Sequence, residues 1–424
     1  MPNGMPWFWT LTKKITWWCA MGMGQRKPFP PAKSGSSYID KLQMEENDMK
    51  PYVVFNPGSE VLEDKRAWQG CPTIARTRGG RMFAGWYTGG AFEPCITNYN
   101  VLVQSDDNGE SWSKPILAVY TNTEKMLRNI DIQLWVDETN RLWVMWTHSP
   151  YYETSKPATI RTNTPWDYHR EFTGVEAMIC NDPDAEVLRW EEPRRICDGF
   201  LRCKPIITKK GEYLFPAYDW IHADHYMLRF SSDRGETFRN VVAAKKPQNE
   251  VFDETMAYEV GDKLCIHART NLGYYSYAES LDGGKTWSET TEYEKAPSTR
   301  FYLARLSTGE LVYVRNISDA ARTGMKVCLS EDDGKTWPYQ LILDERESVS
   351  YPDLAEGEDG FLYIVHDRER DNRAHLNRDT WISGAAKEIL LSKVTVDDIR
   401  RGTLGDGSYA AKIISKGGMD FVEK

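Results

Sequence analysis

Short apolar segments recur along this chain in pairs, and each pair is joined by a turn that contains Gly or Asn. Two such segments around a turn predict a β-hairpin. Six stretches have this form: CPTIARTRGGRMFAGW from Cys71, DIQLWVDETNRLWVMW from Asp131, KPIITKKGEYLFPAY from Lys204, ETMAYEVGDKLCIHAR from Glu254, RFYLARLSTGELVYVR from Arg300 and YPDLAEGEDGFLYIVH from Tyr351. The chain is therefore expected to contain six β-hairpins.

An eight-residue polar motif recurs among these hairpins and fits S-x-D-x-G-x-[ST]-[WF]. Its four copies are 105–112, 231–238, 280–287 and 330–337. The Asp and Ser side chains can bond nearby backbone N–H groups, Gly permits a positive φ, and the aromatic residue can be buried against the sheet. We interpret this motif, the Asp box, as a structural turn, because one carboxylate and one hydroxyl are too few ligands for calcium.

The spacing of these patterns predicts the number of repeats. The last three boxes begin about 50 residues apart, a period typical of four-stranded propeller blades. A degenerate fifth copy, DAEVLRWEEP, ends at Trp190 and Pro193. Six blades over residues 49–424 give each blade roughly 62 residues, enough for four short strands. We predict an all-β protein, a single six-bladed β-propeller domain with Asp-box turns.

Residues 1–48 show neither hairpin nor box and are predicted to be an irregular N-terminal segment. Lys13 and Lys14 precede a Trp-rich apolar run that resembles a signal peptide. The alternatives are a natural translation start at Met44 or Met49, or an arm that packs on the propeller. We expect a cytoplasmic protein, with secretion as the alternative, and no stretch reaches transmembrane length.

Composition narrows the classes of ligand. The net charge of −9 argues against binding nucleic acid or an anionic membrane, while the 12% aromatic content suits packing between blades. The eight cysteines are scattered and the seven histidines do not cluster, so we expect buried free thiols and neither a metal nor another cofactor. The sequence leaves the oligomeric state open.

Candidate chemistry lies at the first residue of each hairpin. In a propeller the innermost strand of every blade starts near the central axis, so these six positions should form a ring around one funnel. The ring consists of Cys71, Asp131, Lys204, Glu254, Arg300 and Tyr351. Polar or ionisable residues at five equivalent positions of apolar hairpins indicate a ligand pocket.

The order of four residues resembles the sialidase (neuraminidase) superfamily of glycoside hydrolases, six-bladed propellers with these Asp boxes, also called BNR repeats. Glu254 opens a hairpin that ends at Arg269, Arg322 shortly precedes a box, and Tyr351 opens the last hairpin. The resemblance covers roughly residues 50 to 395 and rests on this order together with the boxes.

This resemblance implies an exo-acting, retaining glycosidase with an acidic glycan as its partner. The terminal sugar released would be sialic acid or a related 2-keto-3-deoxy sugar acid. Tyr351 would be the nucleophile, as in sialidases, with Glu254 as the base that activates it. Arg269 and Arg322 would hold the substrate carboxylate.

The chain also departs from the family pattern. Sialidases begin the first blade with R-I-P, whose arginine completes a carboxylate-binding triad, but Gly70 stands there in this chain. Arg66 and Arg300 are the candidates to replace it. We therefore expect poor activity on ordinary sialosides.

The residue predicted to protonate the leaving group also differs from the family pattern. The loop after the first hairpin contains Glu93 where the family has an aspartate, and Asp131 is the alternative candidate. Arg300 and Asp131 are predicted to bind substrate. Ion pairing of Arg300, Asp131 and Lys204 across the funnel is the alternative.

Two other functions compete with this interpretation. The first is a propeller glycosidase or polysaccharide lyase that acts on uronic-acid glycans with the same funnel residues. The second is a carbohydrate-binding propeller without catalysis, against which the pairing of Glu254 with Tyr351 argues.

Overall fold

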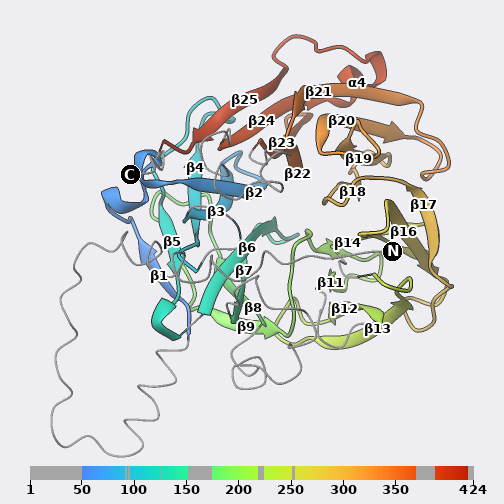
Figure 1. The fold of residues 1–424 in the computed structure, drawn as a ribbon, viewed down its shortest axis with the longest axis horizontal. Helices are drawn as coiled ribbons and strands as arrows, with labels where there is room; N and C mark the ends of the chain where they lie inside the picture. Colours follow the sequence, from blue (N-terminus) through green and yellow to red (C-terminus); the bar gives the residue numbers. More distant parts are fainter. Residues whose placement is uncertain are drawn as a thin grey trace, which may run out of the picture.

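Six small antiparallel sheets stand around one axis, as Figure 1 shows in a computed structural model of the chain. The predicted six-bladed propeller is confirmed. The structure describes residues 50–90, 93, 96–125, 127–150, 174–217, 224–250, 254–368 and 387–418. The predicted N-terminal segment 1–48 lies outside the described residues, so its boundary with the propeller domain stays a prediction.

Each predicted hairpin supplies the two inner strands of a blade. Blade 1 has five strands in the order β1-β5-β4-β3-β2, and the others have four in chain order. Blade 1 contains β1 (Tyr52–Phe55), β2 (Trp68–Arg76), β3 (Met82–Gly89), β4 (Tyr99–Ser105) and β5 (Leu117–Tyr120); blade 2 contains β6 (Leu127–Val136), β7 (Leu142–Pro150), β8 (Gly174–Cys180) and β9 (Arg194–Cys197); blade 3 contains β10 (Ile206–Ile207), β11 (Tyr213–Phe215), β12 (His225–Ser231) and β13 (Arg239–Lys245).

The second half of the ring is built in the same way. Blade 4 contains β14 (Thr255–Val260), β15 (Lys263–Arg269), β16 (Tyr274–Ser280) and β17 (Thr291–Lys295); blade 5 contains β18 (Tyr302–Arg305), β19 (Leu311–Asn316), β20 (Thr323–Ser330) and β21 (Tyr339–Glu347); blade 6 contains β22 (Val349–Glu356), β23 (Phe361–Arg368), β24 (Glu388–Thr395) and β25 (Tyr409–Lys416). A short helix, α4 (Val396–Arg401), follows β24 and is capped by Thr395. No described helix is long and apolar enough to cross a membrane.

Bulges in three inner strands turn side chains toward the axis. The strand register shifts at Gly70/Thr73 in β2, at Ile130/Gln133 in β6 and at Ser350/Asp353 in β22. A residue with positive φ lies within each bulge: Cys71 at 54°, Asp131 at 57° and Tyr351 at 53°. Such a φ is uncommon outside glycine, and bulges redirect side chains next to functional sites.

The Asp boxes are hydrogen-bonded turns, as predicted. In the first box, Asp107 Oδ1 accepts bonds from Ser105 Oγ at 2.7 Å and from the backbone N–H of Ser111 at 2.9 Å, while Gly109 N–H donates to Ser105 Oγ at 2.9 Å. The other three boxes repeat these contacts. Among the described residues no group of His, Cys, Asp and Glu side chains is placed to hold a metal ion.

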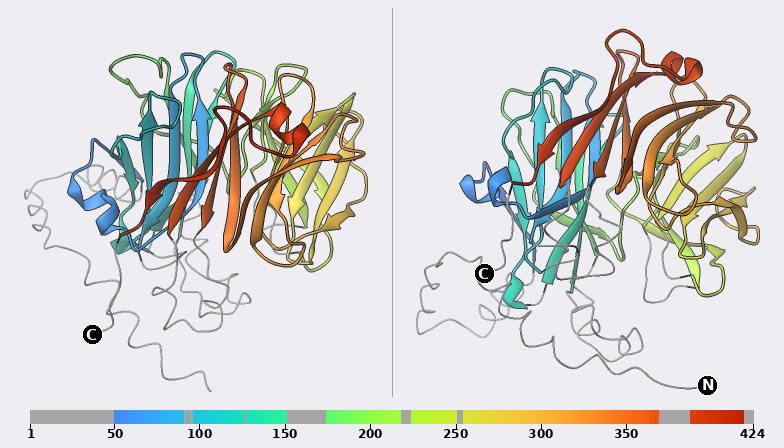
Figure 2. Two further views of the ribbon diagram at one scale, coloured as in Figure 1. Left: turned by 90° about the horizontal axis from the view of Figure 1, so that it is seen from above. Right: turned by 45° about the horizontal axis from the view of Figure 1, so that its top comes forward.

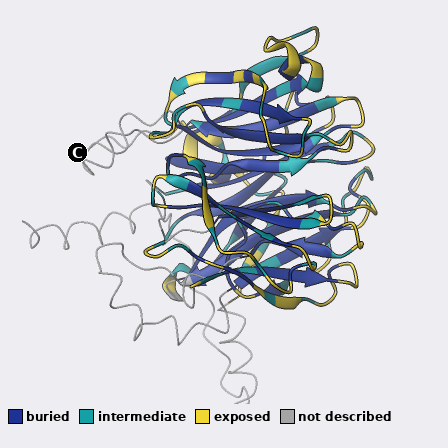
Figure 3. Cartoon of the chain, turned by 90° about the vertical axis from the view of Figure 1, so that its right-hand side faces the viewer, coloured by how far each residue is buried: buried dark blue, intermediate teal, exposed yellow. Residues whose placement is uncertain are grey.

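Apolar residues fill the spaces between neighbouring blades, and Figure 3 shows buried strands with exposed connecting loops. Trp135 of blade 2 meets Tyr213 of blade 3 edge-on, with ring centroids 4.8 Å apart. The six described cysteines are free and buried, as expected: Cys71, Cys180, Cys197, Cys203, Cys265 and Cys328. Cys19 and Cys95 lie outside the described residues.

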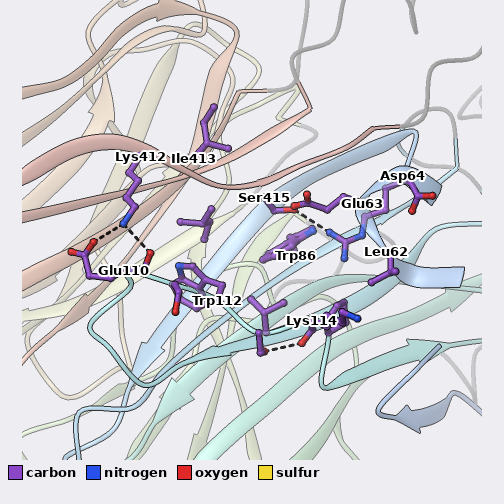
Figure 4. A pocket seen from close by; sticks show the side chains of 16 residues that line it. Leu62, Glu63, Asp64, Trp86, Glu110, Trp112, Lys114, Lys412, Ile413 and Ser415 are labelled. Atoms are coloured by element: carbon purple, nitrogen blue, oxygen red, sulfur yellow. Dashed lines mark hydrogen bonds and ion pairs between the residues drawn. The ribbon is translucent and has the colours of Figure 1, made fainter. Parts of the chain in front are cut away.

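Blades 1 and 6 meet without sharing a strand. Blade 1 contains only β1 to β5, and blade 6 contains only β22 to β25. Figure 2 shows the blue strands of blade 1 beside the red strands of blade 6. Hydrogen bonds cross this seam from Gly418 N–H to the Glu63 carbonyl at 2.7 Å and from Gln69 Nε2 to the Lys387 carbonyl at 2.7 Å. A groove of about 540 Å³ follows the seam (Figure 4).

Candidate active site

Tyr351 lies at the centre of the predicted funnel site, and both its ring and its hydroxyl are held in place. The phenol oxygen accepts a hydrogen bond from Arg269 Nη1 at 3.0 Å and donates to Glu254 Oε1 at 3.3 Å. All three side chains are buried. Three residues that are 15 to 97 positions apart in sequence therefore meet at one hydroxyl group.

Glu254 is held as a carboxylate. Its Oε1 also accepts bonds from Arg269 Nη1 and Arg202 Nη1, each at 2.9 Å. Burial alone would favour the neutral acid, but the charges of Arg269 and Arg202 outweigh it and lower the pKa of Glu254 to about 2. Glu254 is therefore ionised at neutral pH and can accept a proton.

Arg202 joins this group to Asp131, and sequence reasoning did not identify it as a site residue. Its Nε donates to Asp131 Oδ2 at 2.7 Å. Burial raises the pKa of Asp131, although Arg202 acts in the opposite direction, and the carboxylate of Glu93 adds to the increase. The one available signal was position, because Arg202 lies two residues before the ring residue Lys204.

Arg322 and Arg269 both lie beside Tyr351 and share an anchor, Ser298. The Arg322 guanidinium is 5.2 Å from the centroid of the Tyr351 ring, and its Nη2 donates to the Ser298 carbonyl at 3.0 Å. Arg269 Nε donates to Ser298 Oγ at 3.2 Å. The two arginines predicted to bind a carboxylate are thus anchored on the same residue beside the candidate nucleophile.

Arg300 is buried and packed among backbone groups. Its guanidinium is 5.2 Å from the Tyr351 ring centroid and donates to the carbonyls of Arg202 at 2.7 Å, Pro72 at 2.9 Å and Tyr351 at 3.2 Å. This geometry favours a role in positioning Tyr351 and Arg202. Its predicted contact with substrate stays a prediction.

Lys204 forms an ion pair, but its partner is Asp353 and not the ring residue Asp131, which pairs with Arg202 instead, so the alternative of mutual ion pairing within the ring was wrong in its partners. Its Nζ lies 2.9 Å from Asp353 Oδ2 and donates to the Leu354 carbonyl at 2.8 Å. Thr73 Oγ1 donates to the same Asp353 oxygen at 2.7 Å. Lys204 therefore links blade 3 to blades 1 and 6 near the axis.

The two candidate acids have different surroundings. Glu93 Oε2 is 3.9 Å from Cys71 Sγ and is half-buried, whereas Asp131 is buried beside Arg202. The carboxylate of Glu93 contributes to the raised pKa of Asp131, after burial as the main cause. Which of them protonates a leaving group stays open.

Comparison with known proteins places this architecture in a family. Residues 134–364, more than half of the chain, match the family described as BNR repeat-like domain. The chain belongs to the BNR repeat-like family. This agrees with the predicted resemblance to sialidases with Asp boxes. No curated protein matches the sequence significantly.

Solved structures that resemble this BNR repeat-like propeller include sialidases. A Hadza microbial sialidase is 21% identical with a TM-score of 0.58, and the match covers 71% of this chain but only 64% of that one. The intramolecular trans-sialidase of Ruminococcus gnavus is 16% identical with a TM-score of 0.61, covering 82% and 98%. A leech intramolecular trans-sialidase is 15% identical with a TM-score of 0.63, covering 85% and 73%. At these identities the matches establish the fold.

In this BNR repeat-like propeller the Gly70 corner, made of Gly70, Trp68 and Asp367, is filled. A Cβ atom on Gly70 would lie 2.9 Å from the Trp68 ring and 3.0 Å from Asp367 Oδ2. Asp367 Oδ2 accepts from Cys71 N–H at 2.7 Å, and Oδ1 accepts from Ser350 Oγ at 2.8 Å. An indole and a carboxylate thus occupy the direction in which a side chain at position 70 would leave.

Arg66, one candidate to replace the missing arginine, lies elsewhere. Its Nε donates to the Val61 carbonyl at 2.9 Å and its Nη1 to Ser415 Oγ at 3.0 Å, within the seam between blades 1 and 6. The guanidinium stacks on Trp86, 5.6 Å from the ring centroid. These contacts assign Arg66 to the joint between the blades, away from Tyr351.

Proposed function

We propose that this protein is a sialidase-like, retaining exo-glycosidase that releases a terminal acidic sugar, such as sialic acid or a related 2-keto-3-deoxy sugar acid. The observation that carries the proposal is the contact of the Tyr351 hydroxyl with Glu254 and Arg269. Structural neighbours with this fold include sialidases and trans-sialidases, which supports a glycan as substrate.

In the proposed reaction Tyr351 Oη attacks the anomeric carbon while its proton passes to Glu254. The glycosidic bond breaks, and Glu93 or Asp131 gives a proton to the departing oxygen. A water molecule then attacks the anomeric carbon and gives one proton to the carboxylate of the acid. The bond from this carbon to Tyr351 Oη breaks, Glu254 returns its proton to the phenol oxygen, and two inversions leave the anomeric configuration retained. A neutral phenol suits a substrate whose carboxylate is next to the reacting carbon, because it avoids repulsion between like charges.

Arg269 and Arg322 are the proposed holders of the substrate carboxylate. Guanidinium groups bind carboxylates through paired N–H donors, and both arginines flank Tyr351. Because Trp68 and Asp367 fill the Gly70 corner, the substrate carboxylate would be bound by these two arginines without a third one from position 70. This arrangement supports an acidic sugar whose linkage or tail differs from that of ordinary sialosides.

The filled Gly70 corner also favours a second candidate, a glycosidase or lyase that acts on uronic-acid glycans. Product chemistry separates the two. A lyase generates an unsaturated uronide that absorbs ultraviolet light, whereas a hydrolase does not. Location in the cytoplasm, with secretion as the alternative, is likewise a proposal.

The proposal is tested by kinetics on a fluorogenic sialoside and on a panel of 2-keto-3-deoxy sugar acid and uronic acid glycosides. We expect hydrolysis of an acidic glycoside with the anomeric configuration of the first product retained, as NMR would record. Binding of these sugars with no turnover would contradict the proposal and support a carbohydrate-binding propeller. An ultraviolet-absorbing product would replace it with a lyase.

A further inference from the structure

We infer that Arg202 is a positioning residue that holds the carboxylates of Glu254 and Asp131 in one fixed arrangement beside Tyr351. The inference rests on the proposed function, because it assigns Arg202 a task in that reaction. Arg202 would act through Glu254 and Asp131 and form no bond with the reacting atoms.

The geometry is that of a bridge between blades 2 and 4. Arg202 Nε donates to Asp131 Oδ2 at 2.7 Å and Nη1 donates to Glu254 Oε1 at 2.9 Å. The planar guanidinium fixes the distance between the two donor atoms, so the two carboxylates are held at a set separation. A lysine in its place would present a single point charge.

The bridge is itself anchored. The Arg202 carbonyl accepts a hydrogen bond from Arg300 Nη1 at 2.7 Å, and the same Arg300 contacts the Tyr351 carbonyl. Leu201 and Cys203 on either side are buried, and the Arg202 side chain is 13% exposed. Backbone and side chain therefore leave Arg202 little freedom, as a positioning role requires.

The charges around both carboxylates make Arg202 important for protonation. The pKa of Glu254 is lowered, against burial, by the charges of Arg269, Arg202 and Arg300. Burial raises the pKa of Asp131, Arg202 and Arg128 act to lower it, and Glu93 and Glu254 add to the increase. Arg202 belongs to both groups of charges and donates a hydrogen bond to each carboxylate. Without it, two buried carboxylates would face each other with weaker compensation, and protonation of Glu254 would become easier.

The chief test is the pH profile of kcat/KM for Arg202→Gln on the best glycoside. Removing a cation next to a carboxylate shifts the pKa by about one to three units, so the acid limb should move to higher pH by that amount. Arg202→Lys should restore part of the shift. The matched control is Arg76→Gln, since Arg76 also bridges two acceptors, Asn108 and Asp359, but away from the funnel.

An acid limb that stays where it is in Arg202→Gln, or that moves equally in Arg76→Gln, would overturn the inference. A loss of kcat/KM by the same factor at every pH would also contradict it. Such a result is expected of a residue that only stabilises the fold.

A second measurement needs no activity and keeps the inference separate from the proposed function. The pKa of Glu254 is lowered in the fold from 4.5 to about 2, so its ionisation stabilises the fold above about pH 4.5 and that contribution is lost as the pH falls toward 2. The drop in Tm between pH 7 and pH 3 should be smaller in Arg202→Gln than in the wild type.

This difference in Tm should shrink when Glu254→Gln is already present, because that substitution keeps an acceptor oxygen but removes the titratable carboxylate on which Arg202 acts. If it is unchanged in that background, Arg202 does not act through Glu254. A wild-type protein that cleaves no glycoside but shows this coupling would refute the proposed function and leave the bridge intact.

Discussion

At the scale of single residues, the site depends on backbone conformations that few side chains adopt. Tyr351 and Asp131 point into the funnel from bulges with positive φ. The ring position in the sequence predicted that Glu254 and Tyr351 would line one funnel, and the resemblance to sialidases added Arg269 to them. The same residue scale also contains the clearest departure from sialidases, the filled Gly70 corner.

Gly70→Arg tests whether this corner is merely missing an arginine. We expect the substitution to lower Tm and to leave kcat/KM on a sialoside the same or lower, because the new Cβ would contact Trp68 and Asp367. Thermal unfolding and sialoside kinetics measure the two effects. A rise in kcat/KM of about tenfold, the value of one charge-assisted hydrogen bond, would show that the corner can still accept the arginine.

At the scale of elements, the Asp box fixes the turn between the third and fourth strands of a blade. Asp107 accepts bonds from Ser105 and from both the hydroxyl and the backbone N–H of Ser111. The bonds from Ser111 are the main reason that the pKa of Asp107 is lowered to about 2. One side chain therefore connects the two ends of the turn, Ser105 and Ser111.

Asp107→Ala should lower Tm by several degrees and leave the pH profile of activity unchanged, because the box lies away from Tyr351. Asp106→Ala is the matched control. Asp106 is the adjacent box residue, and its carboxylate is exposed and paired with Arg81. A similar loss of Tm in both variants would mean that the turn depends on surface charge rather than on the bonds of Asp107.

Sequence patterns predicted the elements well where hairpins were long and poorly where strands were short or side chains bridged blades. Strand β1 (Tyr52–Phe55) pairs with β5 as a fifth strand of blade 1. Its residues have high β-propensity, but it stands alone without a second strand across a turn, so the hairpin pattern did not include it. The bulges were not foreseeable, because Cys71 and Tyr351 belong to residue types that rarely adopt positive φ; only Asp131 is of a type enriched there. Arg202 was missed because a bridge across blades depends on the closed ring, which no local pattern encodes.

At the scale of the whole molecule, the ring is closed by side chains and tail residues of blade 6 against blade 1. Arg66 is central to this seam, since it is buried, contacts Val61 and Ser415, and stacks on Trp86. The groove drawn in Figure 4 runs along the same joint, with Lys412 and Glu110 at its rim. The stability of the propeller should therefore be sensitive to this one interface.

Arg66→Ala is expected to lower the free energy of unfolding by about 3 kcal/mol, because it removes buried hydrogen bonds and the packing on Trp86. Lys412→Ala is the control from the same groove. Its partly exposed pair with Glu110 should be worth about 0.5 kcal/mol. Denaturant titration measures both, and equal losses would show that Arg66 has no special part in closing the ring.

The central claim is that Tyr351 is the nucleophile, and Tyr351→Phe tests it most directly. Only the hydroxyl is lost, so fold and ligand binding should be nearly intact while turnover falls by orders of magnitude. The measurement is kcat on the best acidic glycoside, with Tm and the Kd of a 2-deoxy-2,3-dehydro sugar acid as controls. We predict an unchanged Tm, a similar Kd and almost no turnover. A purified Phe variant that keeps more than about a tenth of wild-type kcat would contradict the assignment of Tyr351 as the nucleophile.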